Sequence, residues 1–323
     1  MTTKASKLAE IRDAIHQRQH FVTTSHARPD GDAIGSQLAM AYALRALGKT
    51  VRIIDKDPAP PQLQSFPGIA DMEVASHVDG DFDAALVMEC GDLSRTGVNG
   101  LEKYFVINID HHPGNAFYGA INWFDDGAAA CGEMVFDLIE ALGVKLSVEM
   151  ATHVYIALMT DTGGFHFGHI TPHSFEIARR CTEAGAQPEA IARAVYDSST
   201  LGRLRLMGAV LHDLDLEANG RLALVHMSLK MLAECGATHE DSDGLINMPL
   251  TVKEIEAVAF FKEISPESYR ISMRSKGTVD VNRVANAFGG GGHKNAAGCS
   301  MTGPYSQVRR KLLEELCRSL TAS

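Results

Sequence analysis

Tyr104-Phe-Val-Ile-Asn108-Ile-Asp110-His111-His112 is a run of β-forming residues that ends in a carboxylate and two adjacent histidines. The run predicts a strand over Tyr104–Asp110, with the polar triplet at the point where the strand gives way to a loop. Neighbouring side chains of a strand point to opposite faces, but at a strand-to-loop transition both histidines can reach one crevice. A single histidine at such a place is more often a structural hydrogen-bonding residue than a metal ligand. The case for a site therefore depends on further polar clusters in similar places.

Predicted strands and helices alternate on both sides of this run. Such alternation is typical of a mostly parallel sheet flanked by helices, so an α/β fold is predicted for the N-terminal part. The first predicted elements are strands at His20–His26, Thr50–Asp55, Phe82–Glu89 and Tyr104–Asp110 and a helix at Ala33–Leu47.

The pattern changes after Ser147, where mainly helices are predicted, including one long helix from Pro188 to Leu214. Strands return beyond Ala218 and predict a second, smaller α/β domain. The later predicted elements are helices at Val148–Met159, Ser174–Ala184 and Val281–Phe288 and strands at Arg221–Met227, Glu256–Lys262 and Tyr269–Arg274.

Length and composition agree with this organisation. A chain of 323 residues with 45% hydrophobic residues has room for two domains with sizeable cores. We assign residues 1–186 to the first domain, 187–218 to a helical linker and 219–323 to the second domain.

The formal net charge of −10 argues against a broad basic surface for long duplex nucleic acid. Metal ions or a few arginines must therefore attract any anionic substrate locally. The six cysteines are scattered without a C-x-x-C pair, which fits reduced thiols in a cytoplasm. No apolar run approaches the about 18 residues that a membrane span needs, so no membrane partner is expected.

A second polar cluster, His26-Ala-Arg-Pro-Asp30-Gly-Asp32, follows the first predicted strand and leads into a helix. In open α/β sheets, ligands bind at this end of the strands. The alternative is that Asp30 and Asp32 only cap the helix.

Two further acids stand at the ends of predicted elements. Glu89 follows a strand, where an acid can also be a simple strand terminator. Asp161 comes at the end of a helix, where the helix dipole disfavours a negative charge unless something positive compensates it. Together the clusters supply histidines and carboxylates without thiolates, a donor set that suits two divalent cations such as Mn²⁺. Two such ions can generate hydroxide and stabilise charge on phosphorus, which predicts hydrolysis of a phosphate ester.

The stretch Gly289-Gly-Gly-Gly292-His293-Lys294-Asn295-Ala-Ala-Gly298 adds a different signal. Its backbone N–H groups have few side chains around them, so it is a candidate phosphate or carboxylate nest, although a glycine run is often only a flexible turn. Arg274 ends a predicted strand upstream and can clamp a phosphate through two N–H groups.

With these motifs in this order, the chain resembles the DHH phosphoesterase superfamily with a DHHA1 C-terminal domain, and within it the NrnA-type oligoribonucleases and pAp (3′-phosphoadenosine 5′-phosphate) phosphatases. The matching stretches are His26–Ser36, Asp110-His111-His112, Thr160–Phe165 and Gly289–Gly298.

The resemblance implies roles for individual residues. One metal would be held by His26, Asp30 and a bridging acid, and the second by Asp32, the same bridge, His111 and Asp161. His112 would either support the metal ligands from behind or contact the substrate phosphate, with Asp110 orienting its neighbours, and Arg95 would contact substrate. The matching substrate-side residues of the second domain are Arg274, Ser275, Gly291, Gly292, His293 and Lys294.

One residue departs from the family pattern. The bridging ligand is an aspartate in the family, whereas this chain has Glu89, with Asp92 three residues later. Glutamate is one methylene longer than aspartate, so it can bridge only if the strand end or the metal spacing shifts by about an ångström. A displacement of that size can cost about 100-fold in rate. We expect Glu89 to be a ligand; slow turnover, another metal preference or bridging by Asp92 are the alternatives.

The leading hypothesis is an Mn²⁺-dependent phosphodiesterase that releases mononucleotides from very short oligonucleotides, with pAp phosphatase activity as an addition. The alternative within the enzyme class is a phosphodiesterase for cyclic dinucleotides or their linear products. A RecJ-like DNA exonuclease is disfavoured because the chain is too short for an added DNA-binding domain, and the glycine-rich signature disfavours a family-II pyrophosphatase. The hypothesis of another class is a nucleotide-binding regulatory protein that lost catalysis through Glu89. The expectation of a homodimer rests on the family resemblance alone.

Overall fold

Strand β5 (Phe105–Asp110) lies in a six-stranded sheet in which every neighbouring pair is parallel. The strand order β3-β2-β1-β4-β5-β6 runs outward in both directions from a switch point between β1 and β4. In open sheets, ligands bind at the carboxyl ends of the strands at such a point. The other strands are β1 (His20–Thr24), β2 (Thr50–Asp55), β3 (Met72–Val74), β4 (Ala84–Met88) and β6 (Ile121–Phe124).

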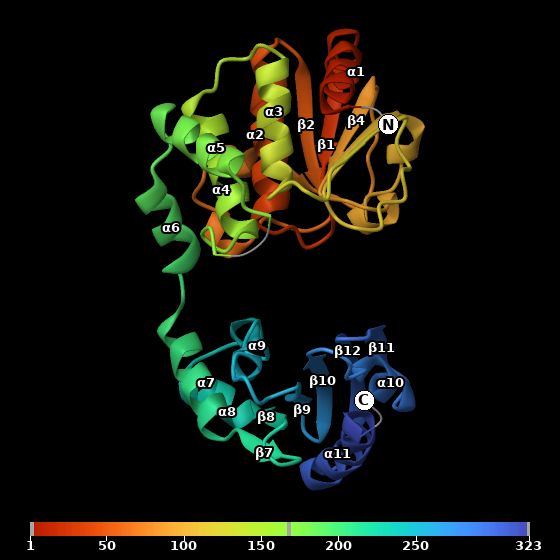
Figure 1. Ribbon diagram of the computed structural model, residues 1–323, viewed down its shortest axis with the longest axis vertical. Helices are drawn as coiled ribbons and strands as arrows, with labels where there is room; N and C mark the ends of the chain where they lie inside the picture. Colours follow the sequence, from red (N-terminus) through yellow and green to blue (C-terminus); the bar gives the residue numbers. More distant parts are fainter. Residues whose placement is uncertain (1–2, 167–168, 322–323) are drawn as a thin grey trace. The chain divides into compact units, whose positions relative to one another are not determined.

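The structure is a computed structural model that describes residues 3–166 and 169–321. The chain divides into two compact units, Met1–Ser198 and Ser199–Ser323, each built on its own six-stranded sheet (Figure 1). The predicted fold class, a parallel sheet flanked by helices plus a smaller α/β domain, is confirmed. Within the described residues, no helix has both the length and the apolar character to cross a membrane.

Helices cover one face of the first sheet (Figure 1). Strand residues such as Leu86 and Ile109 pack there against helix residues such as Leu38 and Leu138 in one buried cluster. The segments before and after β4, residues 75–82 and 90–104, cover the opposite face. The helices of this unit are α1 (Lys4–His16), α2 (Gly31–Ala46), α3 (Cys131–Ala141), α4 (Val148–Asp161), α5 (Pro172–Glu183) and α6 (Pro188–Tyr196).

Two glycines let α2 approach α4 closely. A Cβ on Gly31 would lie 2.4 Å from Oγ1 of Thr160, and a Cβ on Gly35 would lie 2.5 Å from the carbonyl oxygen of His153. Any larger side chain at these positions would push the two helices apart. The close packing brings the first turn of α2 and the last turn of α4 to the same edge of the sheet.

The single long helix predicted from Pro188 to Leu214 is wrong. Helix α6 ends at Tyr196, and α7 (Leu201–His212) begins after Thr200, whose side chain accepts a hydrogen bond from the backbone N–H of Arg203. Residues 197–200 read Asp-Ser-Ser-Thr, and such side chains cap helix ends in preference to continuing a helix. Helix α6 contacts α4 in the first unit, whereas α7 contacts α8 in the second. The assignment of 187–218 to a separate linker stays a prediction.

The second sheet has the order β11-β12-β10-β9-β8-β7, and only β8 and β9 pair in parallel. Helices α10 and α11 pack on one face, and α7, α8 and α9 cover the β8–β9 part of the other. The elements after α7 are β7 (Asp215–Glu217), β8 (Leu222–Met227), α8 (Leu229–Cys235), α9 (Asn247–Leu250), β9 (Ala257–Ser265), β10 (Ser268–Ser275), α10 (Val281–Ala287), β11 (Gly291–His293), β12 (Ala296–Thr302) and α11 (Tyr305–Thr321).

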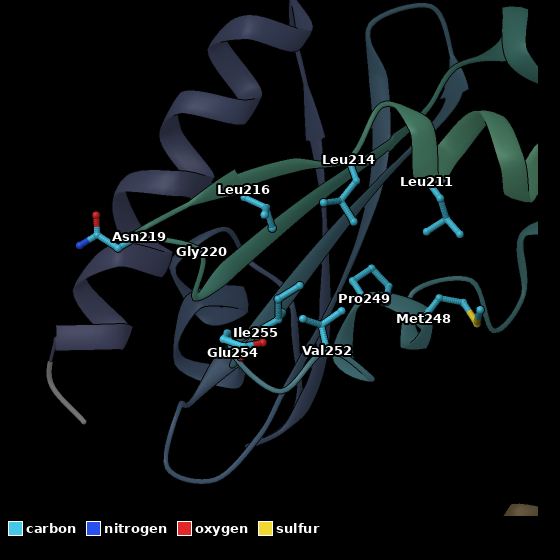
Figure 2. A pocket seen from close by; sticks show the side chains of 10 residues that line it. All are labelled: Leu211, Leu214, Leu216, Asn219, Gly220, Met248, Pro249, Val252, Glu254 and Ile255. Atoms are coloured by element: carbon cyan, nitrogen blue, oxygen red, sulfur yellow. The ribbon is translucent and has the colours of Figure 1, made fainter.

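The second unit also contains an apolar pocket of about 530 Å³, drawn in Figure 2. Leucine side chains from the end of α7 and from β7 face Met248, Pro249 and Val252 across it. None of the residues that line this pocket is among those predicted to hold metal or substrate.

Candidate metal centre and active site

The predicted metal ligands meet at the carboxyl edge of the first sheet. His26 follows β1, Glu89 follows β4 and His111 follows β5, so these three come from neighbouring strands. The short distance between α2 and α4 adds Asp32 from the first turn of α2 and Asp161 from the last turn of α4.

His111 is the centre of the cluster. Its Nε2 lies 2.9 Å from Oε1 of Glu89, 3.6 Å from Oδ2 of Asp161 and 3.8 Å from Oδ2 of Asp32. The ligand atoms of Asp32, His111 and Asp161 all lie within 4.8 Å of one another. The structure thus brings together all four residues proposed for the second metal.

The residues proposed for the first metal are assembled less completely. Nε2 of His26 lies 3.9 Å from Oδ2 of Asp30. Glu89 turns its second oxygen, Oε2, to Nδ1 of His112 at 2.9 Å. His112 thus occupies one oxygen of the acid that the resemblance assigns to both metals.

Backbone carbonyls orient two of the histidines. Nδ1 of His26 lies 3.0 Å from the oxygen of Ala27, and Nδ1 of His111 lies 3.2 Å from the oxygen of Ala128. A carbonyl can only accept, so each Nδ1 carries the proton and donates. Each Nε2 is left facing the carboxylates, which is the usual arrangement of a metal-binding imidazole.

The amino terminus of α3, a helix that the sequence analysis did not predict, holds Asp32 in place. The backbone N–H groups of Cys131 and Gly132 donate to its two oxygens at 2.6 and 2.9 Å, and Ser36 donates to Oδ1 at 2.8 Å. Asp32 is 1% exposed, and burial followed by the charge of Glu89 raises the pKa of Asp32 well above its ordinary value. A bound cation would offset the repulsion between the carboxylates of Asp32 and Glu89.

Glu89, and not Asp92, is the acid that enters the cluster from β4. Its backbone has a φ of +58°, in the left-handed region that non-glycine residues rarely adopt, which turns its side chain into the site. Burial opposes ionisation, but contacts with His111 and His112 outweigh it and lower the pKa of Glu89. Asp92 is exposed and instead caps the turn η3 (Leu93–Thr96) by accepting from Ser94.

The imidazole of His112 contacts the buried carboxylate of Asp110. Nδ1 of His112 lies 3.1 Å from Oδ1 of Asp110, whose other oxygen accepts from Asn115 at 2.7 Å. Asp110 is fully buried, whereas the His112 side chain is 42% exposed. Asp110 and then Glu89 raise the pKa of His112 to about 10. The buried carboxylate of Asp110 therefore holds the Nδ1 side of the His112 ring, while the exposed part of the ring is accessible to a ligand.

The loop that carries His26 is fastened by residues outside the motif. Oδ1 of Asp55 accepts from the backbone N–H of Ser25 at 3.0 Å and from its hydroxyl at 3.1 Å. The N–H of Ala27 donates to the carbonyl of Arg95 at 2.7 Å. The side chain of Arg95 is exposed, and its predicted contact with substrate stays a prediction. Asp55 was not predicted as part of the site; its position at the end of β2, beside the end of β1, is the signal that could have indicated it.

A hollow of about 250 Å³ adjoins His111, His112 and Asp161. Asp126 and His169 also line it, and the sequence analysis singled out neither. The hollow gives a phosphate ester room beside the ligand cluster.

Part of the glycine-rich stretch forms a β-hairpin, and its predicted role as a phosphate or carboxylate nest stays a prediction. Gly291–His293 is strand β11, which pairs with β12 through His293 and Ala296. A Cβ on Gly292 would lie 2.4 Å from the oxygen of Ala296, so glycine is required for the close pairing. Lys294 is exposed in the turn.

Arg274 and His293 are both cross-strand neighbours of Ala296, so they share one face of the second sheet. Ser275 is bound within the local turn, where it donates to the oxygen of Val279 at 2.7 Å and accepts from Asn295 at 2.9 Å. Arg274 and His293 are therefore better placed than Ser275 to meet a ligand.

Residues 20–158 match the DHH family, N-terminal domain, and residues 225–322 match the DHHA1 domain. The chain belongs to the DHH family. Over 323 residues it is 33% identical to the bifunctional oligoribonuclease and PAP phosphatase NrnA of Thermus thermophilus, covering 98% of this chain and 95% of that relative. The protein of the same name from Bacillus subtilis is 28% identical, covering 98% and 99%. The family membership predicted from the motifs is confirmed.

Solved structures with the DHH fold agree. An exopolyphosphatase-related protein from Bacteroides fragilis is 27% identical and superposes with a TM-score of 0.85, covering 97% of this chain and 96% of that one. RecJ from Thermus thermophilus in complex with Mn²⁺ is 15% identical with a TM-score of 0.52, covering 98% of this chain and 55% of that one. The second likeness shows the fold alone.

The residues of this DHH-family site fit divalent cations. Oε1 of Glu89 and Nε2 of His111 are buried without a hydrogen-bond partner among the described residues, although they face each other. Burial, more than the neighbouring charges, raises the pKa of Asp161 as well. Buried carboxylates that lie close together repel one another, and a cation bound between them and the oriented imidazoles would offset this repulsion.

Proposed function

We propose that this protein is a metal-dependent phosphoesterase that hydrolyses very short oligonucleotides to mononucleotides and also removes a phosphate from pAp. The observation that carries the proposal is the convergence of Asp32, Glu89 and Asp161 on Nε2 of His111. The names of the two relatives, 33% and 28% identical over nearly the whole chain, support this substrate class.

Two divalent cations, Mn²⁺ in this proposal, would be held by His26, Asp30, Asp32, Glu89, His111 and Asp161, where they would activate water and offset charge on the phosphate. The chain itself positions the other groups. Asp110 holds Nδ1 of His112 and so leaves Nε2 of that ring to contact a phosphate oxygen. Bound substrate in the adjoining hollow would shield these polar contacts from water.

The second unit would hold the rest of the substrate. Arg274 and His293 share one sheet face, where a guanidinium and an imidazole can bind a phosphate. A short substrate agrees with the net charge of −10, because few phosphates need to be neutralised.

The test is turnover of pApA, pAp and cyclic di-AMP by the full chain, with Mn²⁺ and with EDTA. We expect Mn²⁺-dependent release of AMP from pApA and of phosphate from pAp, and no turnover by Asp161→Ala. Faster cleavage of cyclic di-AMP would favour the cyclic-dinucleotide alternative. Nucleotide binding without any product would contradict the enzyme proposal and favour the regulatory one.

A cytoplasmic location and a homodimer also remain proposals. Five buried cysteines are free thiols, which supports a reducing compartment: Cys90, Cys131, Cys181, Cys235 and Cys299. Light scattering coupled to size-exclusion chromatography would measure the mass in solution.

A further inference from the structure

A buried polar network adjoins the metal centre between the ends of β4 and β5. Asn108 of β5 is fully buried, and Asn115, in the loop after His112, is 8% exposed. Nδ2 of Asn115 donates to Oδ2 of Asp110 at 2.7 Å and to Oδ1 of Asn108 at 2.8 Å. Oδ1 of Asn115 accepts from the backbone N–H of Phe117 at 2.8 Å. Three hydrogen bonds therefore fix the orientation of the Asn115 amide.

Asn115 completes the contacts of the Asp110 carboxylate. Oδ1 of Asp110 lies 3.1 Å from Nδ1 of His112, and Oδ2 accepts from the Asn115 amide. A fully buried carboxylate is destabilised unless hydrogen-bond donors replace the water that it has lost. We expect Asp110 to turn when this amide is removed, and the imidazole of His112 to move with it.

The same network reaches the backbone next to Glu89. The carbonyl oxygen of Cys90 accepts from Nδ2 of Asn108 at 3.0 Å and from the hydroxyl of Tyr118 at 2.8 Å. Nδ2 of Asn108 also donates to the Tyr118 hydroxyl at 2.8 Å, while Oδ1 of Asn108 accepts from Asn115. Two donors therefore hold the carbonyl group of the residue that follows Glu89.

These contacts bear on the metal centre because the backbone of Glu89 is strained. A φ of +58° at a non-glycine residue persists only where the surrounding structure determines it. A further backbone link joins the same two loops, since the N–H of Ala116 donates to the carbonyl oxygen of Gly91 at 2.7 Å. The loop after β5 thus fastens the loop that carries Glu89.

We propose that Asn115 and Tyr118 are positioning residues of the metal centre. Asn115 fixes the carboxylate of Asp110 behind His112. Tyr118 holds the left-handed backbone of Glu89 through the residue that follows it. The inference rests on the proposed function for its choice of Mn²⁺ as the ion, but its test needs no turnover.

The test is calorimetric titration of Mn²⁺ into the full chain without substrate. Tyr118→Phe removes only the hydroxyl and should weaken Mn²⁺ binding by about fivefold, the range expected for one hydrogen bond. The matched control is Tyr104→Phe. Tyr104 is half-buried like Tyr118, and its hydroxyl donates to the carbonyl oxygen of Gly80 at 2.9 Å, before the start of β4 at the opposite edge of the sheet. This control should leave the Mn²⁺ affinity unchanged.

Asn115→Leu removes both amide donors at similar volume and should weaken Mn²⁺ binding by about tenfold. Urea unfolding in EDTA is measured for every variant, because a merely structural role lowers the unfolding free energy without changing the affinity for Mn²⁺. Tyr118→Phe that binds Mn²⁺ as Tyr104→Phe does would overturn the proposal, and so would parental affinity in Asn115→Leu. Weaker Mn²⁺ binding in both variants of a protein that hydrolyses no substrate would contradict the proposed function and still support the positioning roles.

Discussion

Oε1 of Glu89 lies 2.9 Å from Nε2 of His111, and within the described residues neither atom has a hydrogen-bond partner. The longer side chain thus reaches the cluster to which the resemblance assigns a bridging aspartate. We expect the positive φ of Glu89 to be the local adjustment that accommodates the longer side chain.

Glu89→Asp tests this accommodation. We expect kcat/KM with Mn²⁺ to stay within about tenfold of the parent or to rise, because the charge remains and the shorter arm matches the family pattern. Glu89→Gln should lose at least about 100-fold, since it removes the charge. A loss in Glu89→Asp as large as that in Asp161→Ala would show that the site is not the family site with a longer arm.

Gly35→Ala should damage the site through helix packing. Its Cβ would lie 2.5 Å from the His153 oxygen and 2.9 Å from Cβ of Ala157, so α2 must move away from α4 and separate Asp32 from Asp161. We expect a loss of about 1–3 kcal/mol in unfolding free energy and at least tenfold in kcat/KM.

Gly208→Ala is the control for this variant. Gly208 lies in α7 with nothing within 4 Å of the added Cβ, so alanine should be neutral or stabilise by about 0.5–1 kcal/mol. Equal effects of the two substitutions on activity would rule out the packing explanation.

Asp55 should give the protein a pH dependence outside the metal ligands. Burial raises the pKa of Asp55 from 3.8 to about 6, despite the hydrogen bonds from Ser25. The folded protein therefore binds this proton more tightly than the unfolded chain, and its stability falls as pH rises from about 4 through 6. Asp55→Asn stays neutral and can still accept from Ser25. Relative to the parent, its unfolding free energy should rise by about 1 kcal/mol between pH 5 and pH 7 in urea denaturation. If the difference in unfolding free energy between Asp55→Asn and the parent does not change with pH, the raised pKa of Asp55 is refuted.

Divalent cations should stabilise the fold by relieving the crowded carboxylates. At a concentration 100 times the Kd, binding adds about 2.7 kcal/mol, which corresponds to a rise of roughly 5 °C in Tm. Asp161→Asn should show a smaller rise with Mn²⁺ and, in EDTA, a higher Tm than the parent, because it removes one charge from the cluster. Identical melting curves of the two proteins in EDTA would argue against electrostatic strain at this site.

The amino-acid sequence by itself indicated the α/β class, most strands of the first sheet and the family. The strands before His26 and before Asp110-His111-His112 can be recognised locally in the sequence. Burial in the sheet makes the strand itself apolar, and polar residues follow where the strand ends at the edge of the sheet. The break between α6 and α7 was missed because apolar periodicity continues across Asp197–Thr200 while the polar side chains there cap the helix ends.

Only the tertiary structure decided which of Glu89 and Asp92 enters the ligand cluster and what supports the ligands. Glu89 enters the cluster through a left-handed backbone, and Asp92 turns to the surface to cap η3, although both follow the same strand. The amides of α3 that hold Asp32 come from about 100 residues away in the chain. Contacts of this kind arise from the packing of distant segments, and neither spacing nor hydrophobic pattern encodes them locally. The sequence therefore identified which residues could bind metal, and the packing of α2, α3 and α4 against the sheet determined how they are brought together.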